Sequence, residues 1–167
     1  VCANGATVNL TGSVTVAGGG VWSGGSGAFS PNANALNATY TPSPAEVALG
    51  TVTLTLTSTQ NGLCNPVSDQ MTITIIAAPV ADAGSDLFVC SNNANVQLGG
   101  SVAGAGGGQR SGGAGSFTPS IASLNAVYTP TPAEIAAGTL TLPLTTIGNG
   151  NCTPVSDNVL ITFTAAP

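Results

Sequence analysis

The residues best equipped for chemistry in this chain are four cysteines, Cys2, Cys64, Cys90 and Cys152. In a secreted chain an even number of cysteines predicts disulfide bonds, and four cysteines allow three pairings. Few other reactive groups accompany them, because the chain has six aspartates and glutamates, one basic residue and no histidine. The sequence therefore offers cross-linking chemistry and little else.

The shortage of ionisable side chains argues against catalysis. Charged residues make up 4% of the sequence, whereas they make up about 25% of an average soluble protein. General acid–base catalysis, nucleophile activation and transition-metal binding all draw on histidine, lysine, thiolates or clustered carboxylates. We therefore expect a protein that is not an enzyme and that needs no cofactor.

The charge also limits the partners of the chain. The net charge is −5 and Arg110 is the only basic side chain, so the positive surface that nucleic acids and anionic membranes require is missing. No apolar run reaches the roughly 18 residues of a membrane-spanning helix. Hydrophobic residues still make up 43% of the chain, which predicts a folded protein. We expect neither nucleic-acid binding nor membrane insertion.

An internal repeat with a period of 88 residues organises the whole chain. Shifting the sequence by this length aligns it with itself without a gap, and more than half of the aligned residues are identical. The matched residues include Cys2 with Cys90, Tyr40 with Tyr128, and Cys64 with Cys152. A unit of this length is large enough to hold its own core and fold as a domain. The expected domains are residues 1–79 and 80–167.

The first repeat is expected to lack its opening strand. The second repeat begins with residues 80–88, and no counterpart of this segment stands before Val1. We interpret the chain as a piece cut from a longer array of repeats. The alternatives are a genuine terminus, or a strand that a neighbouring subunit donates to the open sheet edge.

Hydrophobic periodicity predicts the fold class. Polar and apolar residues alternate in segments 6–14, 51–57 and 71–75, as in half-buried antiparallel strands. Before the penultimate strand, Ser43 and Glu46 form the pattern of a helix capping box. We therefore predict an all-β protein made of two tandem Ig-like or PKD-like antiparallel β-sandwich repeats, each with one short helical turn.

The same alternation predicts which side chains fill the two sandwich cores. Because the repeat alignment has no gap, equivalent residues should be buried at matched positions. The expected pairs are Phe29 and Phe117, Leu54 and Leu142, Leu56 and Leu144, and Ile73 and Ile161.

Two aspartates at the start of the second repeat are the candidates for a metal site. Asp82 and Asp86 could hold a calcium ion, because Ca²⁺ binds carboxylate and carbonyl oxygens. The chain has no Asp-rich loop, however, and an aspartate beside a strand commonly serves a turn. We therefore expect no resident metal.

The single tryptophan, Trp22, is the candidate ligand-binding residue. It stands where an Ig domain buries its core tryptophan, but the equivalent residue of the second repeat is Arg110. Because burying an unpaired arginine costs several kcal/mol, we expect both side chains to be partly exposed. Trp22 would then be able to contact a ligand, with Tyr40 and Tyr128 as further aromatic candidates.

Several short motifs are distinctive when taken together. They are Ala-Asp-Ala-Gly-Ser-Asp-Leu at 81–87, Val-Cys at 89–90, Tyr-Thr-Pro at 128–130 and Asn-Gly-Asn-Cys at 149–152. This set resembles the Ig-like and PKD-like repeats of very large Bacteroidetes surface proteins, including SprB-like gliding-motility adhesins and other substrates of the type IX secretion system. The resemblance implies an extracellular, cell-surface filament or stalk that attaches cells to surfaces.

The cysteine pairing stays open between two arrangements. In the first, Cys2 bonds to Cys64, and Cys90 to Cys152, within each repeat. In the second, Cys2 bonds to Cys152 across the repeats, and Cys64 and Cys90 bond to neighbouring repeats. Bonded cysteines need Cα atoms within about 7 Å, whereas the turns at the two ends of a six-residue strand lie about 20 Å apart. A bond between equivalent cysteines, such as Cys2 with Cys90, cannot propagate along an array.

These features favour a structural repeat unit of an extracellular filament or stalk-type adhesin, serving as a disulfide-stabilised spacer for attachment or gliding. The expected partners are neighbouring repeats of the same protein or filament, together with surface glycans. The alternative is a carbohydrate- or protein-binding Ig-like module, which requires exposed aromatic side chains.

Overall fold

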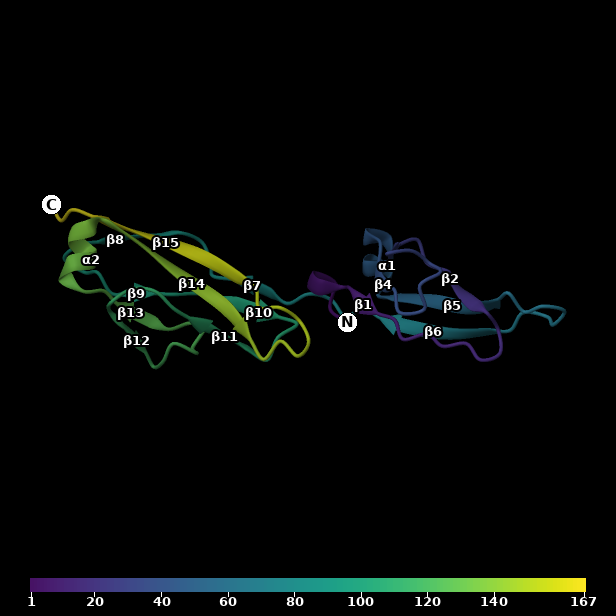
Figure 1. Cartoon of the computed structure of the whole chain (residues 1–167). Coiled ribbons are helices and arrows are strands. Elements are labelled where there is room, and N and C mark those ends of the chain that lie inside the picture. The colour runs from purple at the N-terminus through teal and green to yellow at the C-terminus, as the bar shows by residue number, and fades with distance from the viewer. The chain divides into compact units, whose positions relative to one another are not determined.

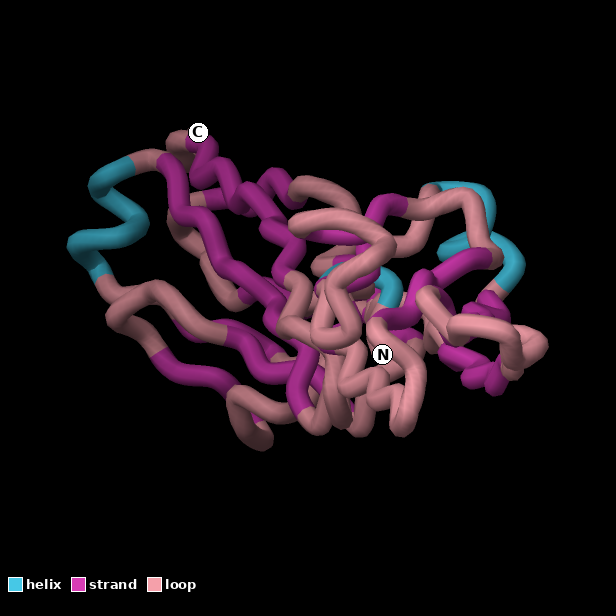
Figure 2. Tube along the Cα trace, turned by 45° about the vertical axis from the view of Figure 1, so that its right-hand side comes forward, coloured by secondary structure: helices cyan, strands magenta, loops and turns pink.

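The computed structural model describes residues 1–167, which fold as two compact units, Val1–Ala78 and Pro79–Pro167. Strands are the main regular structure of both units, and each unit contains one α-helix of six residues (Figure 2). No helix is both long enough and apolar enough to cross a membrane.

Unit 1 contains two three-stranded sheets (Figure 1), with the strand orders β1-β4-β3 and β2-β5-β6. All neighbouring strands in these sheets are antiparallel. The elements of the unit are a 3₁₀ turn η1 (Ala3–Gly5), β1 (Val8–Asn9), β2 (Gly19–Ser23), β3 (Ala28–Ser30), β4 (Thr39–Thr41), α1 (Pro44–Leu49), β5 (Thr51–Thr59) and β6 (Ser68–Thr74).

Unit 2 repeats this plan with additional strands. Its sheets have the orders β12-β13-β9, β11-β14-β15-β8 and β10-β7. The elements are β7 (Val80–Asp82), β8 (Leu87–Cys90), β9 (Val96–Gln97), β10 (Ser101–Ala103), β11 (Gly107–Arg110), β12 (Ser116–Thr118), β13 (Val127–Thr129), α2 (Pro132–Ala137), β14 (Thr139–Ile147) and β15 (Ser156–Thr164).

The all-β sandwich repeats predicted from the sequence are confirmed. One strand pair departs from the predicted antiparallel arrangement, because β8 runs parallel to β15. These two strands are separated by most of the repeat, so no tight hairpin turn imposes an antiparallel direction on them. The corresponding place in unit 1 holds a single parallel bridge between Cys2 and Ile76.

The strand predicted for residues 6–14 is much shorter in the structure, where β1 covers only Val8–Asn9. Residues 13–15 form no strand in unit 1, although their counterparts Ser101–Ala103 form β10 in unit 2. The difference arises because β10 pairs with β7, and an extended segment needs such a partner to satisfy its backbone groups.

Each unit has its own hydrophobic core, and most of the predicted core residues are confirmed. Those that are buried at matched positions are Leu54 and Leu142, Leu56 and Leu144, and Ile73 and Ile161. Phe29 and Phe117 are only half-buried, because they lie on the edge strands β3 and β12. Their rings pack on Tyr40 and Tyr128, with centroid separations of 4.8 and 4.7 Å.

The predicted helical turn is confirmed in both units, as α1 and α2. In α1, the Glu46 amide donates to the Ser43 hydroxyl at 3.3 Å, and the Ser43 amide donates to the Glu46 carboxylate at 2.7 Å. Gly50 ends the helix with φ of 75°, a left-handed conformation that favours glycine. These local signals determine where the helix begins and ends.

Candidate functional site

The four cysteines exist in two chemical states. Cys2 and Cys152 are each disulfide-bonded, whereas Cys64 and Cys90 are free thiols, one exposed and one half-buried. In the repeat, Cys2 corresponds to Cys90 and Cys152 corresponds to Cys64. Each unit therefore contains one bonded cysteine, and the bonded cysteines occupy different positions of the repeat.

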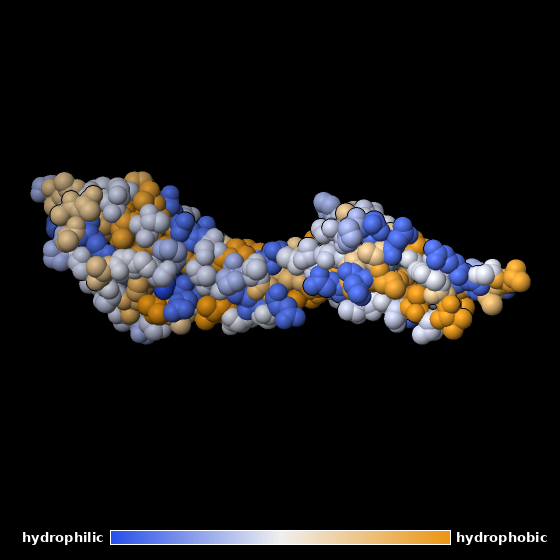
Figure 3. Space-filling view, in the orientation of Figure 1, coloured by the Kyte–Doolittle hydropathy of each residue, from blue (hydrophilic) through white to orange (hydrophobic).

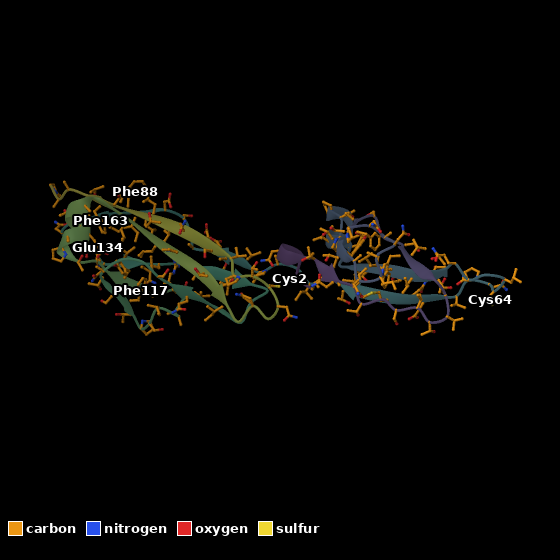
Figure 4. The ribbon with its side chains drawn as sticks, in the orientation of Figure 1. Cys2, Cys64, Phe88, Phe117, Glu134 and Phe163 are labelled. Carbon is orange, nitrogen blue, oxygen red and sulfur yellow. The ribbon has the colours of Figure 1, made fainter.

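The intra-repeat pairs, Cys2 with Cys64 and Cys90 with Cys152, are not formed. Cys2 bridges to Ile76, beyond the end of β6, whereas Cys64 lies in the turn before β6 begins. Figure 4 shows Cys2 and Cys64 at opposite ends of unit 1. The seven residues of β6 span about 20 Å, well above the roughly 7 Å between the Cα atoms of bonded cysteines.

Each bonded cysteine lies at the end of its unit where the connecting chain leaves or enters. The sulfur of Cys2 is 4.0 Å from the carbonyl oxygen of Ala77, among the last residues of unit 1. Cys152 lies in the turn between β14 and β15. At the base of this turn, the Asp157 carboxylate accepts a 2.8 Å hydrogen bond from the amide of Ala83, directly after the opening strand β7.

The two calcium candidates serve the backbone. Asp82 Oδ1 accepts a 2.9 Å hydrogen bond from the Gly84 amide, and Asp86 Oδ1 accepts one of 2.9 Å from the Leu160 amide. No group of three or more histidines, cysteines and carboxylates gathers around them. These contacts explain both aspartates as caps of a turn and of a strand edge.

The expectation that Trp22 and Arg110 are partly exposed is wrong. Trp22 is 6% exposed and Arg110 is 1% exposed. The Trp22 indole donates to the Leu36 carbonyl at 3.1 Å, and Arg110 Nη2 donates at 3.1 Å to the carbonyl of Leu124, the counterpart of Leu36. The two side chains therefore fill the same place in their sandwiches and reach the same backbone acceptor.

Backbone oxygens make the burial of Arg110 tolerable. Its Nη2 also donates to the carbonyls of Gly99 and Ala83, at 2.9 and 3.2 Å, while Nε and Nη1 have no hydrogen-bond partner. Burial lowers the pKa of Arg110, and the Asp157 carboxylate opposes that shift. Sequence reasoning considered only ion pairing and missed these carbonyl acceptors.

The other aromatic candidates are also unavailable to a ligand. Tyr40 and Tyr128 are fully buried, and each hydroxyl donates to a carboxylate. Tyr40 bonds to Glu46 at 2.8 Å, and Tyr128 bonds to Glu134 Oε1 at 2.7 Å. An exposed aromatic that the sequence did not reveal is Phe88, on β8 (Figure 4). Every residue of β8 is apolar, so alternation gave no signal there.

Unit 1 has an open groove along one sheet edge, which we call the edge groove. It consists of three adjoining hollows of about 180, 190 and 230 Å³. The space-filling view in Figure 3 shows apolar surface on unit 1, and the exposed apolar residues of this unit include Val16, Leu63 and Val67. The residues lining two or more of the hollows are Ser13, Thr15, Leu56, Ser58, Val67 and Asp69.

Comparisons with known proteins give a distant likeness. No family model and no curated protein matches the chain. Similar solved structures include protocadherin gamma B2 extracellular cadherin domains 3–6, at 18% identity over 88% of this chain and 40% of that chain, with a TM-score of 0.36. Another is Drosophila N-cadherin EC1-3, at 9% identity over 89% of this chain and 56% of that chain, with a TM-score of 0.41.

A third similar structure, human mucin-like protocadherin EC1-2, has 13% identity over 95% of this chain and 94% of that chain, with a TM-score of 0.35. The chain spans 40%, 32% and 27% of the length of the first three similar structures. Likenesses of this degree identify neither a family nor a function.

Proposed function

We propose that this chain is a structural repeat unit of an extracellular filament or stalk-type adhesin, in which β-sandwich repeats act as disulfide-linked spacers. The observation that supports the proposal is the oxidation pattern. Cys2 and Cys152 are disulfide-bonded, while their equivalents in the other repeat, Cys90 and Cys64, are free. Structural disulfides persist in oxidising surroundings such as the cell exterior.

In this proposal Cys2 bonds to Cys152. Neither residue has another oxidised cysteine in the chain to bond with, because Cys64 and Cys90 are free. Cys2 lies at the exit end of its unit, beside Ala77, and Cys152 lies at the entry end of the other.

The free thiols are the other half of the same pattern. Cys90 is equivalent to Cys2, so in an array it bonds to the Cys152-type cysteine of the following repeat. Cys64 is equivalent to Cys152, so it bonds to the Cys2-type cysteine of the preceding repeat. Overlapping bonds of this kind link each repeat covalently to the next. A pulling force is then carried by the disulfide bonds, and most of the folded chain between them is not stretched.

A spacer role agrees with the surfaces of the two units. The aromatic residues that a carbohydrate-binding module would present, Trp22, Tyr40 and Tyr128, are buried, and their equivalents serve the same packing in each sandwich. Attachment to surfaces, gliding and a Bacteroidetes source follow from the sequence resemblance. In this proposal adhesive contacts, including any with surface glycans, belong to other parts of the array.

The proposal is tested with a tandem chain made of residues 1–167, a second copy of residues 80–88, and then residues 1–167 again. This fusion keeps the 88-residue period throughout. Oxidised glutathione serves as the oxidant, because each new disulfide releases two protons and transfers two electrons to it. Peptide mapping by mass spectrometry should find Cys2 bonded to Cys152 in each copy, and Cys90 of the first copy bonded to Cys64 of the second.

The matched control is Cys90→Ser in the first copy, which should leave the Cys2–Cys152 bonds in place and Cys64 of the second copy unpaired. Bonds within a repeat, or thiols at Cys90 and Cys64 that stay free in the oxidised fusion, would contradict the proposal.

A further inference from the structure

We propose that the edge groove of unit 1 binds one extended strand, and that its occupant is the linker segment of a preceding repeat, with the sequence type of residues 80–84. The inference rests on the proposed tandem array and adds a binding site to it. The supporting observation is a comparison of the two units. In unit 2, the surface that corresponds to the edge groove is covered by β7, which pairs with β10.

Unit 2 provides the template for the bound state. There β7 pairs antiparallel with β10, so that Val80 lies opposite Ala103 and Asp82 lies opposite Ser101. The next residue, Ala83, is 1% exposed and belongs to the core. Its amide donates to the Asp157 carboxylate, and its carbonyl accepts from Arg110. A segment of small residues therefore closes this side of the sandwich.

Unit 1 contains the same receiving residues without an occupant. Residues 13–15, the counterparts of β10, form no strand, and Asp69, the counterpart of Asp157, is exposed. Val67 is 72% exposed, whereas its counterpart Val155 is half-buried. Two further residues of unit 1 are more exposed than their counterparts in unit 2. Leu56 is more exposed than Leu144, and Met71 is more exposed than Val159.

The shape of the groove suits a closely approaching backbone. In unit 2, a Cβ atom added at Gly100 would lie 3.1 Å from the carbonyl oxygen of Asp82, so the strand passes directly over a glycine. Unit 1 has Gly12 at the equivalent position. Gly12 lines the hollow of about 230 Å³ together with Trp22 and Asp69. An apolar wall and one carboxylate acceptor therefore face the path of the incoming segment, as in unit 2.

These observations select the occupant. The antiparallel register of unit 2 places a valine opposite Thr15 and an aspartate opposite Ser13. The following alanine then occupies the buried position and donates its amide to Asp69. β-strand addition of this kind gains affinity from backbone hydrogen bonds and specificity from alternate side chains.

The experiment adds a copy of residues 80–88 directly before Val1 of the full chain. Because Val1 is the counterpart of Val89, no further linker is needed. Amide hydrogen exchange is then followed at Ser13 and Thr15, because the amides of their counterparts in unit 2 face β7. The expected result is that exchange at these amides slows by at least about tenfold, because a paired strand edge opens less often.

A control extension carries Ala83→Asp in the added copy alone, which would place an unpaired carboxylate in a buried position. Exchange at Ser13 and Thr15 should then remain as fast as in the unextended chain. In the receiving unit, Asp69→Ala should remove part of the protection, and Asp157→Ala should have the matching effect on β10 of unit 2.

Unchanged exchange at Ser13 and Thr15 with the native extension, or equal protection from the Ala83→Asp extension, would overturn the inference. Protection that appears only in dimers, detected by size-exclusion chromatography, would also overturn it, because the occupant would then come from a second chain. The bond between Cys2 and Cys152 is mapped in the same samples. If that bond is present while protection is absent, the groove proposal fails and the array proposal stands.

Discussion

The hydroxyl of Tyr128 donates a 2.7 Å hydrogen bond to the carboxylate of Glu134, which also accepts 2.7 Å bonds from the amides of Ala114 and Thr131. Burial alone would raise the pKa of Glu134, but the hydrogen bonds outweigh it and lower the pKa to about 2. Burial and the neighbouring carboxylate raise the pKa of Tyr128 to about 12. The pair therefore links the stability of unit 2 to pH at both extremes.

The first prediction concerns acid. The folded-state pKa of Glu134 lies below its ordinary value of 4.5, so its contribution is complete above pH 4.5 and is lost as the pH falls towards 2. We expect unit 2 to lose on the order of 2 to 3 kcal/mol of unfolding free energy over this range. Urea denaturation of the wild type and of Glu134→Gln should show this loss in the wild type alone. An equal acid sensitivity in the variant would contradict the assignment.

The second prediction concerns base. Because the folded-state pKa of Tyr128 lies above its ordinary value of 10, its contribution is complete below pH 10 and is lost as the pH rises towards 12. Tyr128→Phe should lower stability by about 1 to 2 kcal/mol at pH 7, since the Gly115 amide and Glu134 lose a partner. The variant should show a smaller loss between pH 10 and 12, and thermal melts should be flat between pH 5 and 9 for both proteins.

The third prediction concerns backbone strain at Val16. This residue has φ of 71°, whereas its counterpart in unit 2 is Gly104, with φ of 68°. A β-branched residue in the left-handed region is strained by roughly 1 kcal/mol or more. Val16→Gly should therefore stabilise unit 1 by about 1 kcal/mol in denaturant melts. Val14→Gly is the control, and it should destabilise the unit because Val14 packs against the core.

The fourth prediction concerns Trp22 as a core residue. Trp22→Ala should destabilise unit 1 by about 3 to 5 kcal/mol, the usual range for truncating a buried aromatic side chain. Phe88→Ser, which changes an exposed aromatic, should change stability by less than about 0.5 kcal/mol. Circular dichroism during urea titration measures both. If Trp22→Ala changed the free energy of unfolding only slightly, the assignment of Trp22 to the core would be wrong.

Local signals made part of this fold predictable. The capping box of Ser43 and Glu46 needs only residues three positions apart, so the sequence contained the signal for the start of α1. The gap-free repeat and its alternation identified the buried leucines and isoleucines in the same way.

Contacts between distant segments made the rest unpredictable. The burial of Arg110 depends on carbonyls of Ala83, Gly99 and Leu124, none of which is an ionic partner that a sequence pattern would reveal. The loss of a strand at residues 13–15 depends on whether another segment covers that edge. Repeat symmetry left two cysteine pairings open, because only the placement of the turns decides between them.

The most direct test of the account is to pull a single oxidised chain from its two termini. A bond between Cys2 and Cys152 encloses about 150 residues, which reach roughly 50 nm when fully extended. The account predicts that this length stays hidden under force and appears only after a reducing agent is added. Release of the full length without a reducing agent would contradict the proposed inter-repeat bond and, with it, the disulfide-linked spacer.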